Sequence, residues 1–166
     1  MNHKKLERSL YRAEPVKCEH CGHIDFKQWH KLSAPHLKGL VKLAEAVHRL
    51  NRPATRYEAG IIGDGSQYGN FAAMRWWGLI EPSEGKAWTL TQLGWDFLTG
   101  RKRVSERVLT LKGEMIGLSV GLCSFKELAD TNTWEKADYL RSRIALTEKD
   151  YAQNSLFAHL LTNQHA

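Results

Sequence analysis

Cysteine and histidine side chains gather in one short stretch of the sequence, and both residue types bind transition metals. Cys18 and Cys21 stand at the two-residue spacing that lets two thiolates hold one zinc ion, and His30 and His36 supply imidazoles downstream. The sequence therefore predicts a structural zinc with these four ligands. Two other interpretations stay open, because the chain has no second CxxC pair: free thiols in a degenerate knuckle, or a redox pair.

Other catalytic chemistry has little support in the sequence. The motifs HExxH and GxSxG are absent, and the glycine-rich segment GIIGDGSQYGN lacks the Lys-Ser/Thr ending of a phosphate-binding loop. That segment is better explained as a turn between two helices. A zinc ion with four protein ligands would also leave no open position for water. We expect a protein that is not an enzyme, with a metal-dependent reaction at the knuckle as the weaker hypothesis.

The chain is basic, and its positive charge is concentrated in two blocks. Lys and Arg number 24 against 18 Asp and Glu, which gives a net charge of +6 at pH 7. Such a balance favours a polyanionic partner. We predict that both blocks contact phosphates, although a run of like charge can also be a solvated surface. The cations are Lys4, Lys5, Arg8 and Arg12 in the first block and Arg101, Lys102 and Arg103 in the second.

The sequence has no segment typical of a secretory signal or a membrane span. Its first residues are charged and amphipathic, and the longest uncharged apolar run, MIGLSVGLCSF, has 11 residues, too few to cross a bilayer. The three cysteines, an odd number, argue against a disulfide framework and for a reducing compartment. We therefore expect a cytoplasmic protein that makes no membrane contact.

Apolar periodicity and capping residues predict the first half of the fold. A short basic helix ends before Pro15, and the cysteine knuckle then leads into a strand. Ser33 and Pro35 begin a helix that runs to Leu50 and buries one apolar stripe. A short second helix is predicted over TRYEAGI, and a third runs from Ser66 to Gly78.

The second half is predicted as two hairpins and three helices. One hairpin turns at EPSEG and is followed by a helix that begins at Thr91, and the other turns at Lys112 and Gly113. Helices over 133–144 and 147–161 complete the chain. The last helix has an apolar face that needs a cover, which is either the chain's own core or a second copy in a homodimer.

The segment WGLIEP followed by KAWTLTQLGWDFL carries a family resemblance. It resembles the end of the recognition helix, the wing and the next helix of bacterial winged-helix regulators of the MarR, PadR and ArsR type. Residues 16–119 are also similar to small winged-helix proteins of bacteriophages and mobile elements, which carry a CxxC knuckle ahead of the same core. The resemblance implies an α+β fold with a winged helix-turn-helix core at 33–100. A basic helix and knuckle at 1–32 would precede this core, and a β-hairpin and helical extension at 101–166 would follow it.

The resemblance also implies a function and a set of contact residues. In those families the third helix enters the major groove of DNA and the wing touches the backbone. The chain would then be a DNA-binding transcriptional regulator of phage or mobile-element type. Ala72 and Ala73 occupy positions where such helices carry base-reading side chains. The contacts implied are Ser66, Gln67, Asn70 and Arg75 from the helix and Lys86 from the wing.

Tryptophans are concentrated around the same segment. We expect Trp77, Trp88 and Trp95 to belong to the core, since large aromatic side chains dominate small cores. Trp76 points to another face of the helix, where it either packs within the chain or anchors a partner. The second possibility supports an alternative function: a phage-encoded interaction module that inhibits or modulates a host nucleic-acid machine, such as an anti-CRISPR protein or a modulator of RNA polymerase.

Overall fold

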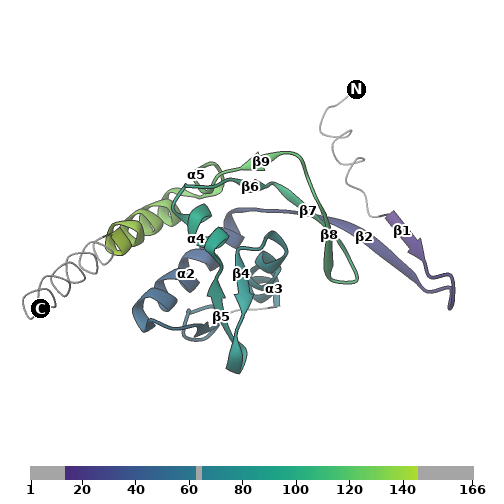
Figure 1. Cartoon of the computed structure of the whole chain (residues 1–166), viewed down its shortest axis with the longest axis horizontal. Coiled ribbons are helices and arrows are strands. Elements are labelled where there is room, and N and C mark those ends of the chain that lie inside the picture. The colour runs from purple at the N-terminus through teal and green to yellow at the C-terminus, as the bar shows by residue number, and fades with distance from the viewer. Residues whose placement is uncertain (1–13, 63–64, 146–166) are drawn as a thin grey trace, which may run out of the picture.

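This computed structural model describes residues 14–62 and 65–145, with only the backbone given at 65–68 (Figure 1). The described chain mixes helices and sheets, which confirms the α+β prediction at this level. Two predictions fall outside the described residues: the helix over 147–161 and the basic helix with Lys4, Lys5, Arg8 and Arg12.

Four antiparallel strands form a sheet that projects from the rest of the molecule, and we call this sheet the arm (Figure 1). Its order is β1-β2-β7-β8. Strand β2 is the longest of the four and pairs with β1 along its first half and with β7 along its second half. The bounds are β1 Glu14–Lys17, β2 Ile24–Lys31, β7 Arg107–Leu111 and β8 Glu114–Leu118.

Helix α2, Ala34–Leu50, begins and ends as the sequence predicts. Ser33 is its N-cap, and the Nδ1 atom of His36 accepts the Ser33 backbone N–H at 3.2 Å. Pro35 stands in the first turn, where the missing N–H costs nothing. The helix ends at Asn51, which is in the left-handed conformation.

The prediction of a second helix over TRYEAGI is wrong. Residues 56–60 form a turn after the short strand β3, Ala54–Thr55. The Glu58 carboxylate accepts the Thr55 N–H at 2.8 Å and pairs with Arg52 at 2.6 Å. These side-chain bonds compete with a helical backbone, and Gly60 then turns the chain with a φ of +67°.

The third helix has two parts. Helix α3, Gly65–Ala73, continues into the 3₁₀ turn η1, Met74–Trp77, and Gly78 ends it with a φ of +69°, as predicted. The next hairpin is also confirmed: β4 Ile80–Pro82 and β5 Ala87–Leu90 flank the turn η2, Glu84–Lys86. With β3 these strands form a sheet of order β3-β5-β4.

The chain then returns to the top of the molecule as drawn in Figure 1. Thr91 caps α4, Gln92–Leu98, by accepting the Gly94 N–H at 3.0 Å. Strands β6, Val104–Ser105, and β9, Leu122–Cys123, pair with each other. Helix α5, Phe125–Leu128, follows, and residues 131–145 are helical, which confirms the helix predicted at 133–144.

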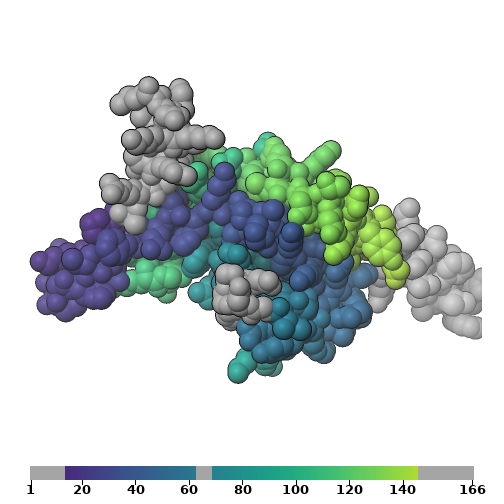
Figure 2. All heavy atoms as spheres, turned by 180° about the vertical axis from the view of Figure 1, so that it is seen from behind, coloured from purple at the N-terminus to yellow at the C-terminus, as the bar shows by residue number. Residues whose placement is uncertain are grey.

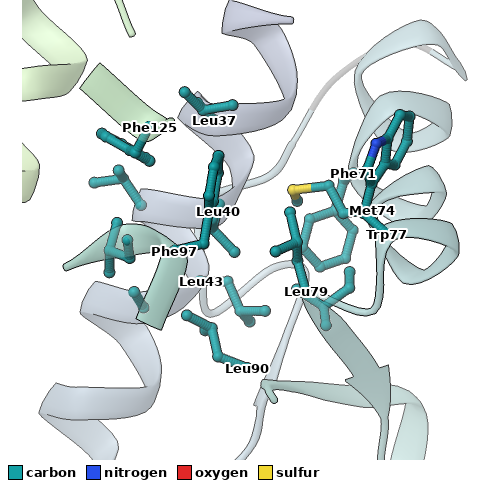
Figure 3. Packing of buried hydrophobic residues seen from close by; sticks show 14 of the residues in the cluster. Leu37, Leu40, Leu43, Phe71, Met74, Trp77, Leu79, Leu90, Phe97 and Phe125 are labelled. Atoms are coloured by element: carbon teal, nitrogen blue, oxygen red, sulfur yellow. The ribbon is translucent and has the colours of Figure 1, made fainter. Parts of the chain in front are cut away.

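The hydrophobic core lies between α2 and the elements packed around it. Leu37 and Leu40 of α2 lie among Phe71, Phe97 and side chains from the later part of the chain (Figure 3). The rings of Phe97 and Phe125 meet edge to face, with centroids 5.8 Å apart. Residues from both sides of the predicted boundaries at 32/33 and 100/101 share this core, and those boundaries stay predictions.

Within the part of the chain that the structure describes, no helix is both long enough and apolar enough to cross a membrane.

Gly94 allows α4 to lie directly against the chain at Leu79. A Cβ atom at Gly94 would stand 2.0 Å from the Leu79 carbonyl oxygen, a backbone atom that cannot rotate away. We expect Gly94→Ala to lower the free energy of unfolding by about 3 kcal/mol, measured by urea titration. Gly69→Ala is the matched control, because a Cβ there meets open space in a helix and should add about 0.5 to 1 kcal/mol. A Gly94→Ala variant as stable as the wild type would contradict the close packing.

Candidate nucleic-acid interface

The inner face of the third helical segment is fixed by three buried side chains. Phe71, Met74 and Trp77 pack into the core at the predicted three-residue spacing. The Trp77 Nε1–H also donates to the Ser105 carbonyl at 2.9 Å. Trp88 and Trp95 are partly buried against the same core, as expected. The outward face of the segment is therefore well defined.

That outward face carries few side chains suited to reading bases. Arg75 is exposed and has no partner within the part of the chain that the structure describes. Asn70 is half-buried and faces a pocket of about 370 Å³ that α2 also lines. Ala72 and Ala73 are half-buried. Ser66 and Gln67 lie in α3, but their side chains are outside the described residues.

The turn η2 between β4 and β5, which the sequence predicts as a wing, carries one exposed cation. Lys86 has a φ of +60°, next to Gly85 at +66°, and borders a surface pocket of about 660 Å³ together with Arg56 and Trp88. The Arg56 guanidinium lies 4.7 Å from the centre of the Tyr57 ring. Sequence reasoning missed Arg56, because it belongs to the segment taken for a helix and reaches the wing only through the pairing of β3 with β5.

The second basic block is largely paired with acids. Arg101 Nε lies 3.2 Å from the Asp96 carboxylate, and Arg103 contacts both Glu127 oxygens at 2.9 and 3.0 Å. Lys102 is exposed, with no partner among the described residues. Figure 1 shows the start of β6 and the turn between β4 and β5 at opposite ends of the molecule, so this block and the wing tip lie far apart. Phosphate contacts by this block stay a prediction.

Trp76 connects the helical segment to the arm. Its ring is half-buried, with its centroid 4.5 Å from that of His30 in β2, and its Nε1–H donates to the Gly113 carbonyl at 2.8 Å. The structure thus shows intramolecular packing at Trp76. A further contact with a partner protein stays a prediction.

The four predicted zinc ligands are not brought together. Cys18 and Cys21 lie in the turn between β1 and β2, but His30 stands six residues along β2 from Ile24. Six residues of extended strand span about 20 Å. The imidazoles are also engaged, His30 with the Thr110 hydroxyl at 2.8 Å and His36 with Ser33. Within 14–62 and 65–145 no three His, Cys, Asp or Glu side chains converge as metal ligands.

The structure also has a basic groove along α2, which the sequence did not predict. Two adjoining pockets of about 370 and 720 Å³ follow the helix and share Lys42 and Glu45. Lys38 pairs with Asp130 at 3.0 Å, whereas Lys42 donates to the Gly60 carbonyl at 3.2 Å and has no carboxylate partner among the described residues. The remaining basic residues of the groove are Arg49, Lys136 and Arg143, with His48 beside them.

Comparison with family models, curated proteins and solved structures gives no match to this chain.

Protonation of two histidines should weaken the fold at low pH. Burial lowers the pKa of both His30 and His36 below the ordinary value of 6.5. The unfolded chain binds a proton at each histidine more readily than the folded chain does. The free energy of unfolding is therefore largest above about pH 6.5 and falls as the pH drops below that value. The slope is at most about 1.4 kcal/mol per pH unit for each group.

The measurement is urea unfolding at pH 7.5 and 5.5 for the wild type and a His30→Gln/His36→Asn double variant. Each replacement keeps a polar atom near the nitrogen that contacts Thr110 or Ser33. The double variant should lose less stability between the two pH values than the wild type. Equal losses would show that other groups cause the pH dependence.

Proposed function

We propose that this chain is a DNA-binding protein with a winged-helix core, acting as a transcriptional regulator of phage or mobile-element type. The observation that carries the proposal is the order of elements between Ala34 and Leu90. A long helix, a short strand, a turn, a helical segment, a strand, a wing and a final strand follow one another. The short strand pairs with the last strand of the wing, giving the order β3-β5-β4.

This arrangement supports placing α3 and η1 in a groove of the duplex. The segment packs on α2 with its apolar face, and its outward face is left for a partner. At the contact between the two helices, Gly39 of α2 faces Phe71 and Met74.

The chemistry available on that face favours phosphate contacts over base reading. Arg75 on η1 and Lys86 on the wing are exposed cations, and Arg56 borders the wing pocket. Asn70 is an amide of the type that can hydrogen-bond an adenine edge. Ala72 and Ala73 offer no polar atom for reading bases. Binding therefore depends mainly on contacts with the DNA phosphates, and so on the salt concentration.

Removing Arg75 or Lys86 should weaken binding to a random-sequence duplex, measured by fluorescence anisotropy at several salt concentrations. Each Arg75→Ala or Lys86→Ala change should lower the slope of log K against log salt by about one, because one phosphate contact is lost. Arg103→Ala is the comparison variant: because Glu127 already pairs with this side chain, its removal should change the slope less than removal of Arg75 or Lys86. No duplex binding by the wild type at low salt would overturn the proposal.

The alternative function, a module that binds a host protein through Trp76, makes a different prediction for the same experiment. It requires no duplex binding and an effect of Trp76→Ala on partner retention. Its support is weaker, because the indole already contacts His30 and Gly113 within the chain.

A further inference from the structure

The turn between β1 and β2 holds Cys18 and Cys21 in one tight loop at the outer end of the arm. The Cys18 N–H donates to the His23 carbonyl at 2.8 Å, and the Gly22 N–H donates to the Cys18 carbonyl at 2.9 Å. Gly22 makes the turn possible with a φ of +72°. The loop therefore closes on itself through backbone bonds and presents two thiols at a fixed spacing.

A lysine from the neighbouring hairpin reaches the strand that follows the loop. Lys112 Nζ lies 3.2 Å from Asp25 Oδ2. His23 lies 3.4 Å from the other oxygen of Asp25. The charged and titratable side chains of the loop and its described neighbours are therefore Lys17, Glu19, His20, His23, Asp25 and Lys112.

Two thiolates are half of the ligands that a structural zinc ion takes. Among the described residues, no third side chain converges with them. A zinc ion with four thiolates has a net charge of −2. The cations around each loop, Lys17 beside Gly22 and Lys112 paired with Asp25, would offset part of that charge.

The surface next to the loop exposes apolar side chains. Ile24 and Phe26 follow the loop on β2, point to the same face of the arm and are each about half exposed, at 50% and 51%. Figures 1 and 2 show from opposite sides that the β1–β2 turn projects beyond the rest of the described chain. A second molecule can therefore approach the loop without meeting the core.

We propose that Cys18 and Cys21 form half of a tetrahedral zinc site, which a second copy of this chain completes with the same two residues. The two arms meet tip to tip around one metal ion, and the exposed apolar side chains of β2 cover each other beside it. This site does not depend on DNA binding and replaces the ligand set expected from sequence spacing.

The test is zinc stoichiometry together with molecular mass for the full chain, reduced and then titrated with Zn²⁺. We expect one zinc per two chains, a dimer by light scattering, and dissociation to monomers when the metal is chelated. Cys18→Ser/Cys21→Ser should bind no zinc and stay monomeric, with a far-ultraviolet spectrum that shows an intact fold. Lys112→Gln should bind zinc about tenfold more weakly, as expected for loss of an outer-shell group.

His30→Gln is the matched control, because it changes a histidine of the sequence-based ligand set that the structure places elsewhere. It should retain the full zinc content and the dimer. One zinc per monomer, loss of zinc in His30→Gln, or a wild-type chain that takes up no zinc and forms a Cys18–Cys21 disulfide would each overturn the proposal. Because none of these readouts involves DNA, their failure is distinguishable from failure of the proposed function.

Discussion

The two consecutive tryptophans of η1 determine how the arm sits on the helical core. Side chains of adjacent residues in a 3₁₀ turn point about 120° apart, so the pair can reach two different parts of the chain. Trp77 lies beside His36 at the start of α2, with ring centroids 5.5 Å apart, and donates to Ser105. Trp76 donates to Gly113 at the turn between β7 and β8 and stacks on His30 of β2. One helical turn thus connects elements that precede it in the sequence, at His30 and His36, with elements that follow it, at Ser105 and Gly113.

This connection decides which part of the helix remains for a ligand. With the apolar face in the core and Trp76 against the arm, the remaining described surface offers Asn70, two alanines and Arg75. The count of 24 Lys and Arg residues overstates the cations that such a surface can use, because Arg101 and Arg103 are paired with carboxylates. Affinity for a polyanion would therefore come from a small number of cations. Little specificity for a base sequence follows from such contacts.

The sequence predicts those features that depend on local chemistry. Ser33, Gly78 and Thr91 mark helix ends correctly, because capping involves only a few neighbouring residues. The pairing of β2 with β7 depends on residues about 80 positions apart and has no local signal. For the same reason the predicted ligand set fails: the spacing from Cys21 to His30 suits a loop that folds back, whereas an extended strand carries the imidazole away from the thiols. The turn at Glu58 was missed because its side chain replaces helical hydrogen bonds.

The arm and the helical segment are mechanically linked, and this bears on how a dimer would meet DNA. If two chains join at the tips of their arms, the contacts of Trp76 fix the position of each η1 relative to the shared metal. The separation of the two recognition surfaces is then set by the length of β2 and by one indole, and a duplex is bound well only where its groove repeat matches that separation. Two linked sites also raise the effective concentration of the second contact, which compensates for the few cations on each chain. In such a dimer, Trp76 would influence DNA binding by holding η1 in a fixed position relative to the metal ion.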